Sequence, residues 1–210
     1  MLNSTPKTSA KPPVHALLLA GGRSKRMGRD KADLLYEGRT QLERTLELLA
    51  QLNIPASLSI RDGQSLPKSA VNAGVSPIYD HPDLQNIGPL GGMISALTEL
   101  SGYALLVLAC DLPFLDIATL KMLLARRKPT CLATAYRSSH DGLPEPLCAI
   151  WEPHCISYVS QSLQDGIRCP RKILIQGNTH LLSLPSPEAL DNINTPDEYE
   201  EAVSRLQISK

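Results

Sequence analysis

Residues 14–31 read VHALLLAGGRSKRMGRDK, a mainly apolar run followed at once by a basic segment with three glycines. The run over residues 14–20 is too short for a helix and stops abruptly at Gly21 and Gly22, which predicts a buried strand of a parallel sheet. Between Arg23 and Lys31 the chain carries five cationic side chains, offset only by Asp30. Glycines that let the backbone approach a ligand, next to clustered cations, suit the binding of a polyphosphate. The spacing alone is also compatible with a solvated basic loop whose glycines form a turn.

The rest of the chain alternates predicted strands with predicted helices. Strands are expected near residues 56–61, 75–79, 103–110, 130–137, 147–151 and 180–184, and helices near 41–52, 91–100, 116–126, 154–164 and 196–206. This alternation predicts a mostly parallel sheet with right-handed crossovers. We therefore expect a single doubly wound α/β domain over residues 14–210, preceded by a flexible N-terminal tail over residues 1–13. Ligands of such domains bind beyond the carboxyl ends of the strands.

The composition excludes several classes of protein. Of the 210 residues 42% are hydrophobic, and 21 basic residues balance 21 acidic ones. Such a chain is not disordered, no apolar run approaches the roughly 20 residues of a membrane span, and zero net charge argues against binding nucleic acid or a membrane through a bulk field. The first 13 residues lack the apolar stretch of a signal peptide, and the five cysteines form no C-x-x-C pair. We expect a cytoplasmic protein whose cysteines are small apolar fillers.

Three segments that follow predicted strands carry groups suited to ligand binding. Asp111 comes directly after the strand near 103–110 and is placed to bind Mg²⁺, although a turn or helix-capping aspartate has the same spacing. Asp80 has the equivalent position after the strand near 75–79, where a turn residue is the alternative. Residues 88–92 read GPLGG at a helix start, where glycines let a base or ribose lie near helix N–H groups. Helix packing alone would account for Gly91 and Gly92.

These motifs together resemble one known family. The pattern L-A-G-G-x-S-x-R-M-G-x-D-K over residues 19–31 is similar to the signature loop of the MobA-like nucleotidyltransferases, the molybdenum cofactor guanylyltransferases. Gly22 and the Asp30-Lys31 pair resemble the guanylyl branch rather than related cytidylyl or sugar-nucleotide enzymes. The segments GPLGG (88–92), CDLPF (110–114) and NINTP (192–196) resemble further parts of the family. The resemblance covers about residues 14–200 and implies a Rossmann-like nucleotidyltransferase fold.

The resemblance also implies roles for single residues at the nucleotide. Lys31 would bind its phosphates, Asp111 would hold Mg²⁺, and Arg26 would neutralise charge on the departing pyrophosphate. These three residues, Arg26, Lys31 and Asp111, are the expected catalytic groups. The expected nucleotide-binding residues are Leu19, Ala20, Gly21, Gly22, Lys31, Asp80, Gly88 and Asp111.

The expected acceptor-binding residues lie in the C-terminal third. Asn192 and Asn194 alternate on an extended stretch and would face the same way, which suits a pterin edge or a phosphate. Thr195, before Pro196, is also a good helix N-cap. Arg168 and Arg171 belong to a basic cluster over residues 168–172, expected to be a turn, which would meet the acceptor's phosphate or remain solvated. The stretch 140–146 would shape the acceptor side.

The reaction implied by the family is transfer of GMP from GTP to the terminal phosphate of molybdopterin or molybdenum cofactor, with release of pyrophosphate and with Mg²⁺ as cofactor. Proteins that deliver or receive the cofactor are possible further partners; nucleic acid and membranes are not expected. Residues 59–64 (SIRDGQ) depart from the Asn-containing segment that family members often carry after the second strand. A CTP-dependent relative is therefore the nearest alternative, followed by one with a sugar-phosphate acceptor. From a different class, a nucleotide-binding module without catalysis remains an alternative.

Overall fold

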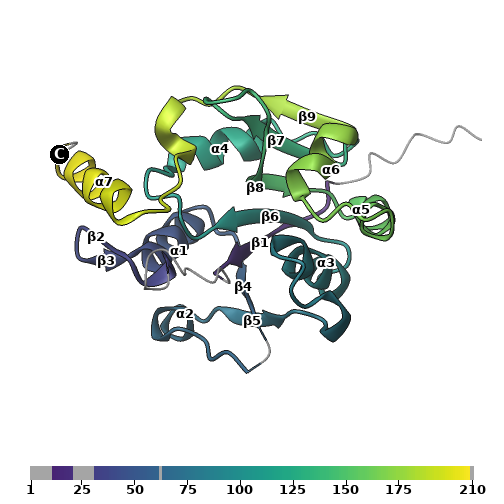
Figure 1. Cartoon of the computed structure of the whole chain (residues 1–210), viewed down its shortest axis with the longest axis horizontal. Helices are drawn as coiled ribbons and strands as arrows, with labels where there is room; N and C mark the ends of the chain where they lie inside the picture. The colour runs from purple at the N-terminus through teal and green to yellow at the C-terminus, as the bar shows by residue number, and fades with distance from the viewer. Residues whose placement is uncertain (1–10, 21–30, 62, 209–210) are drawn as a thin grey trace, which may run out of the picture.

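The central feature of the computed structural model, which describes residues 11–20, 31–61 and 63–208, is a seven-stranded sheet in the order β5-β4-β1-β6-β8-β7-β9 (Figure 1). Its strands are β1 (Val14–Leu19), β4 (Ala56–Ile60), β5 (Ser76–Tyr79), β6 (Ala104–Ala109), β7 (Ala133–Arg137), β8 (Pro144–Trp151) and β9 (Thr179–Leu182). Neighbouring strands are parallel except at β8, which is antiparallel to both β6 and β7. The predicted doubly wound, mostly parallel α/β fold is confirmed.

Helices cover both faces of this sheet (Figure 1). One face carries α1 (Gln41–Gln51), α2 (Lys68–Asn72) and α4 (Ile117–Ala125), and the other carries α3 (Pro89–Glu99), α5 (Cys155–Gln164) and α6 (Pro170–Gln176). The last helix, α7 (Pro196–Ile208), packs against a small hairpin of β2 (Leu35–Tyr36) and β3 (Arg39–Thr40). The described chain also contains the short 3-10 helices η1 (Lys31–Asp33), η2 (Pro82–Leu84) and η3 (Pro187–Leu190). No helix in the described part of the chain is long and apolar enough to cross a membrane.

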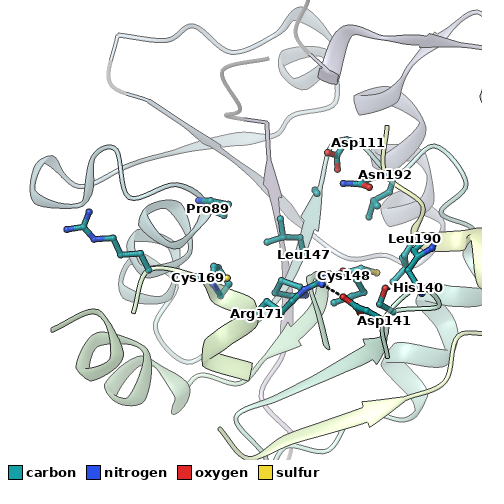
Figure 2. Close-up of a pocket in the computed structure, with 17 residues that line it drawn as sticks. Pro89, Asp111, His140, Asp141, Leu147, Cys148, Cys169, Arg171, Leu190 and Asn192 are labelled. Carbon is teal, nitrogen blue, oxygen red and sulfur yellow. Dashed lines mark hydrogen bonds and ion pairs between the residues drawn. The ribbon is translucent and has the colours of Figure 1, made fainter. Parts of the chain in front are cut away.

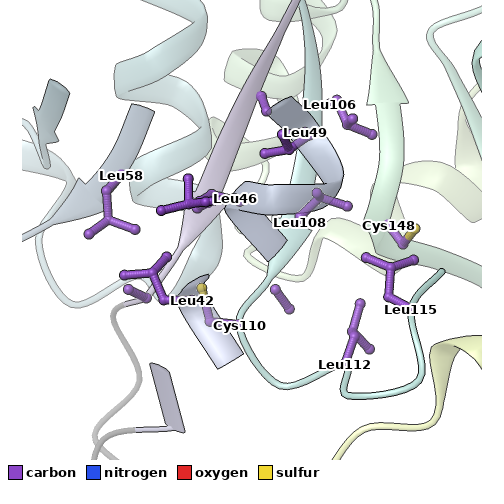
Figure 3. Packing of buried hydrophobic residues seen from close by; sticks show 14 of the residues in the cluster. Leu42, Leu46, Leu49, Leu58, Leu106, Leu108, Cys110, Leu112, Leu115 and Cys148 are labelled. Atoms are coloured by element: carbon purple, nitrogen blue, oxygen red, sulfur yellow. The ribbon is translucent and has the colours of Figure 1, made fainter. Parts of the chain in front are cut away.

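The core lies in two layers, one on each side of the sheet. Along β1, Ala16 and Leu18 join the cluster under α1, whereas Leu17 joins the cluster under α3. Figure 3 shows the first layer, in which leucines of α1 pack against leucines of β4 and β6. A central parallel strand is buried on both faces and is therefore apolar at almost every position. For this reason β1 and β6 can be recognised in the sequence as short apolar runs.

Several boundaries differ from the expectation. The basic cluster expected as a turn over 168–172 contains the start of α6, with Pro170 at its first position and Ile173 and Leu174 buried. Proline fits the first helical turn, so it begins this helix rather than preventing it. Strand β8 begins at Pro144, three residues before the predicted strand, since proline is tolerated at the first residue of a strand. Pro146, inside β8, lies where the pairing with β7 shifts register between Ala135 and Arg137.

The N-terminal boundary shows contacts within the expected tail over residues 1–13. The carbonyl of Pro12 accepts a hydrogen bond from Arg127 Nη1 at 2.7 Å, and the carbonyl of Pro13 accepts one from Ala104 N at 2.9 Å. Contacts with the domain therefore begin before Val14. Residues 1–10 lie outside the described part of the chain.

Candidate active site

The sheet reverses its order of winding between β1 and β6, and a ligand crevice is expected at the carboxyl ends of these strands. Leu19 pairs with Ala109, so β1 and β6 end side by side. Leu19 closes β1, and Ala20 is buried just beyond it. Of the other expected nucleotide-binding and catalytic residues, Gly21, Gly22 and Arg26 lie outside the described residues, as does the side chain of Lys31, whose backbone opens η1.

Asp111 lies two residues beyond β6, in a turn at this crevice. Its carbonyl accepts a hydrogen bond from the backbone N–H of Ile193 at 3.1 Å. Ile193 is buried between Asn192 and Asn194, so this bond holds the predicted acceptor-binding stretch against the predicted metal-binding turn. Two segments far apart in the sequence are thereby joined at one end of the sheet.

A pocket of about 550 Å³ opens beside Asp111 (Figure 2). It brings together Asp111 and three of the four expected acceptor-binding residues, namely Arg168, Arg171 and Asn192. It is also lined by the first half of β8, including Leu147 and Cys148, by the start of α6, and by Ser138, His140 and Asp141. Asn194 lines a second, smaller hollow of about 300 Å³, whereas Asn192 and His140 line both.

The guanidinium of Arg171 is held by two carboxylates in this pocket, one of which, Asp141, is labelled in Figure 2. Nη1 donates to Asp141 Oδ2 and Nη2 donates to Glu145 Oε2, each at 2.9 Å. A backbone hydrogen bond from Leu143, together with the charge of Arg171, lowers the pKa of Asp141 below its ordinary value. The sequence did not predict these pairs, since they depend on α6, a helix that was expected to be a turn.

A second link ties residues 138–146 to the C-terminal stretch. His140 Nε2 lies 2.9 Å from Oδ1 of Asp191, the residue that precedes Asn192. The expected cap of the last helix is confirmed: Thr195 Oγ1 accepts a hydrogen bond from Glu198 N at 3.3 Å, and Glu198 Oε2 accepts one from Thr195 N at 3.2 Å. These contacts fix Asn192 and Asn194 between two anchored segments.

Asp80 also lies at the carboxyl ends of the strands, just after β5. Its carboxylate accepts a hydrogen bond from Ser59 Oγ at 3.2 Å, and partial burial raises its pKa above the ordinary value, a shift that the Ser59 bond opposes. A Cβ on Gly92 would lie 2.2 Å from Ser59 Oγ and 3.3 Å from Asp80 Oδ1. The glycine at 92 therefore lets α3 pack directly against this pair.

The start of α3 also depends on Gly88, another expected nucleotide-binding residue. Gly88 has φ 71° and ψ −150°, a conformation essentially limited to glycine. It precedes Pro89, the first residue of α3, which lines the pocket beside Asp111. The GPLGG segment thus brings a helix N-terminus to the crevice.

The side chains at the crevice could supply only some of the ligands that a hard cation needs. Within the described ranges no group of three or more His, Cys, Asp and Glu side chains is arranged to hold a metal ion. A single carboxylate such as Asp111 suits Mg²⁺, which commonly takes one or two protein carboxylates and fills its remaining positions with substrate phosphates and water. The residues present therefore fit a metal that arrives with a nucleotide.

The cysteines are mostly structural. Cys110, Cys131, Cys148 and Cys155 are buried, as expected of apolar fillers. Burial raises the pKa of both Cys148 and Cys155 to about 12, which keeps their thiols protonated. The expectation was wrong for Cys169, which is exposed and lines the pocket.

A doubly wound sheet that carries Asp111 and a helix N-terminus at its switch point has the arrangement of a nucleotide-binding α/β protein. The model of the MobA-like NTP transferase domain matches residues 16–180. The chain therefore belongs to the MobA-like NTP transferase family, as its motifs indicated.

Named relatives and a solved structure agree with this assignment. The chain is 33% identical over 193 residues to a molybdenum cofactor guanylyltransferase of Pseudomonas aeruginosa, a match that covers 90% of this chain and 94% of that protein. It is 30% identical over 191 residues to a molybdenum cofactor biosynthesis bifunctional protein of Synechocystis sp., covering 89% of this chain but only 53% of the longer relative. The crystal structure of molybdopterin-guanine dinucleotide biosynthesis protein A from Archaeoglobus fulgidus shares the fold, with a TM-score of 0.73, 22% identity and coverage of 92% and 99% of the two chains.

Proposed function

We propose that this chain transfers GMP from GTP to the terminal phosphate of molybdopterin or molybdenum cofactor and releases pyrophosphate. The observation that carries the proposal is the pocket in which Asp111, after β6, lies beside Asn192 and the arginines of the 168–171 segment. A nucleotide at the switch point would reach Asp111 from the β1 side, and the acceptor would approach from this pocket. Asp111 would stand between donor and acceptor.

The attacking group in this reaction is a phosphate oxygen that is already ionised at neutral pH. No protein nucleophile or general base is needed, so the chain's residues act by positioning and charge stabilisation. We assign phosphate binding to Lys31, stabilisation of the leaving pyrophosphate to Arg26, and metal binding to Asp111. When bound, Mg²⁺ supplies charge stabilisation at the donor's phosphate oxygens.

The acceptor is held by a mixed set of groups in this proposal. Asn192 and Asn194 both donate and accept hydrogen bonds, which suits the edge of a pterin. Arg168 attracts the acceptor's phosphate, while Arg171 contributes a charge already shared with Asp141 and Glu145. A phosphate that binds Arg171 competes with two carboxylates, so Arg168 is the stronger candidate for the first contact.

The choice of base follows the family branch. Gly22 and the Asp30-Lys31 pair support GTP, as does the guanylyltransferase name of the relative that matches at 33% identity. The segment 59–64 keeps CTP as the second candidate, because it departs from the family's Asn-containing segment. On this proposal the nucleobase lies near Asp80 and the start of α3.

The proposal is tested by supplying molybdopterin, Mg²⁺ and one nucleoside triphosphate at a time, and by identifying the nucleotide joined to the product by mass spectrometry. GMP is expected on the product, and Asp111→Ala should lose turnover while its circular dichroism spectrum stays that of the wild type. A product carrying CMP would move the chain to a cytidylyl function. Substantial turnover by folded Asp111→Ala would remove the metal assignment.

A further inference from the structure

The turn that follows β6 is fixed by three hydrogen bonds to consecutive main-chain carbonyls. The donors come from two different parts of the chain: α1 provides two of them and the C-terminal stretch provides the third. The bonds run from Ile193 N to Asp111 O at 3.1 Å, from Gln41 Nε2 to Leu112 O at 3.0 Å, and from Arg44 Nη2 to Pro113 O at 3.2 Å. The backbone that carries Asp111 is therefore held at every residue of the turn.

Gln41 makes its bond from a buried position, with only 3% of the residue exposed. Its side-chain oxygen, Oε1, is buried and has no hydrogen-bond partner within the ranges that the structure describes. An unsatisfied buried oxygen lowers stability, and an apolar side chain of the same shape would avoid that cost. The same amide NH₂ group also lies 3.4 Å from Thr45 Oγ1, a longer contact within α1. The shorter bond to Leu112 is therefore the main contact that requires an amide at this position.

Arg44 lies one helical turn after Gln41 on the same face of α1. Its Nη1 donates to Glu37 Oε2 at 2.7 Å, and the guanidinium lies 5.9 Å from the centroid of the Tyr36 ring. The carboxylate and the ring orient the guanidinium, so that its second arm reaches the carbonyl of Pro113. The arginine is mostly buried, which limits the alternative directions that it can take.

We propose that Gln41 and Arg44 are positioning residues for Asp111. They contact neither the nucleotide nor the acceptor, and they act by fixing the turn over residues 111–113 so that the carboxylate meets the metal in one preset geometry. Groups that orient a metal ligand typically change metal affinity when they are removed. This inference rests on the proposed function, in which Asp111 binds the metal of a metal–nucleotide complex.

The test is Mn²⁺ binding in the presence of GTP, followed by electron paramagnetic resonance of free Mn²⁺. Gln41→Met keeps the length of the side chain and removes both the donor and the unsatisfied oxygen. We expect its Mn²⁺ dissociation constant to rise about tenfold, with only a small change in Tm, because the cost of leaving the Leu112 carbonyl without its donor is offset by removal of the unsatisfied oxygen. The apparent KM for Mg²⁺ should rise in parallel. Gln51→Met, the same change at the exposed end of α1, is the matched control and should alter neither quantity.

Two further variants separate the possible outcomes. Arg44→Met should also weaken Mn²⁺ binding, through the carbonyl of Pro113, and Asp111→Asn should abolish it. Wild-type binding of Mn²⁺ by Gln41→Met would overturn the positioning inference alone. A large fall in Tm with a proportional loss of binding would give Gln41 a structural role and would also overturn it. If Asp111→Asn bound Mn²⁺ like the wild type, the metal assignment of the proposed function would fail instead.

Discussion

At the scale of single residues, Asp80 is a carboxylate in a partly buried position, where burial disfavours its ionised form. Burial raises its pKa above the ordinary value of 3.8, so the folded chain binds this proton more tightly than the unfolded chain does. The resulting stability is fully present below the unfolded pKa and is lost as the pH rises through the folded pKa. At neutral pH the ionised carboxylate therefore lowers stability, as is common for groups retained for function.

Asp80→Asn should consequently raise the Tm at neutral pH and weaken the binding of GTP. The difference in Tm should vanish below about pH 3.8, where the wild-type side chain is protonated. Thermal unfolding followed over this pH range checks the stability, and titration with GTP checks the binding. Asp83→Asn, at a strongly exposed carboxylate nearby, is the control. A lower Tm for Asp80→Asn at neutral pH would contradict the argument.

The two arginines of the proposed acceptor pocket, Arg168 and Arg171, should differ in their contribution to acceptor binding. Arg171→Met leaves Asp141 and Glu145 without their shared cation, so the pocket loses a positive charge and exposes two negative ones. We expect it to raise the KM of the phosphorylated acceptor by about tenfold or more, beyond the effect of Arg168→Met, with the KM of GTP unchanged. Steady-state kinetics with the acceptor varied measures both effects. Equal effects of the two substitutions would show that the carboxylates do not influence the acceptor.

Residue positions were predictable from the sequence where they follow directly from a strand. Asp111 and Asp80 come just after β6 and β5, and parallel strands bring such residues to one edge. The partners of Arg171 were not predictable, because they lie on a different strand and a loop. Gln41 was missed for a similar reason: its side chain bonds a carbonyl 71 positions away in the sequence, and no local pattern marks such a contact.

At the scale of elements, α3 packs against β4 more closely than a side chain at its second glycine would allow. Gly92→Ala places a Cβ 3.1 Å from Ser59 Cβ as well as 2.2 Å from its hydroxyl. We expect a loss of about 1–3 kcal/mol in the free energy of unfolding, which is typical of overpacking, and weaker binding of GTP, because Asp80 shares the contact. Urea unfolding measures the first effect and titration the second.

The double variant Ser59→Ala, Gly92→Ala is the matched control for this prediction. It removes the hydroxyl that meets the new Cβ, so part of the lost stability should return. If Gly92→Ala were as stable as the wild type, the close contact between α3 and β4 would not constrain this position.

Element types were predictable where hydrophobic periodicity was strong, as in β1, β6 and α1. Prediction failed at α6 and at the start of β8, where prolines and charged residues resemble a loop. Both elements form because of what they pack against: Ile173 and Leu174 of α6 enter the layer beneath α3 and α5. Tertiary burial therefore decided these two elements, and local preference did not.

At the scale of the whole molecule, a buried ion pair lies at the end of the sheet opposite Asp111. Arg127 and Glu152 form two hydrogen bonds, each 2.6 Å long, with Glu152 fully buried. Glu152 follows Trp151, which pairs with Leu105 near the start of β6, so the pair lies at the far end of this strand from Asp111. Arg127 also donates to the carbonyl of Pro12 and so fixes the chain ahead of β1.

Glu152→Gln should destabilise the fold by about 3–5 kcal/mol, because it leaves the Arg127 charge buried without its partner. The kcat of the molecules that remain folded should be unchanged, since the pair lies away from the crevice. Arg127→Met combined with Glu152→Leu should recover most of the stability. Chemical unfolding of the wild type and the two variants, with kcat corrected for the folded fraction, provides the check. A large fall in the corrected kcat would mean that the Arg127–Glu152 pair is coupled to the crevice around Asp111.

The overall topology was predictable from the order of strands and helices, because parallel strands with right-handed crossovers leave few arrangements. The antiparallel insertion of β8 between β6 and β7 was not, since no pattern along residues 144–151 encodes its direction. That strand brings residues 144–148 to the same end of the sheet as Asp111. The pocket beside Asp111 therefore arises from the part of the topology that the sequence did not reveal.

Pyrophosphate release, measured with molybdopterin, Mg²⁺ and each nucleoside triphosphate in turn, tests the central claim most directly. The proposed function predicts release with GTP that depends on both molybdopterin and Mg²⁺, and loss of that release in folded Asp111→Ala. Tight binding of GTP without any release of pyrophosphate, or release that requires CTP instead, would contradict it.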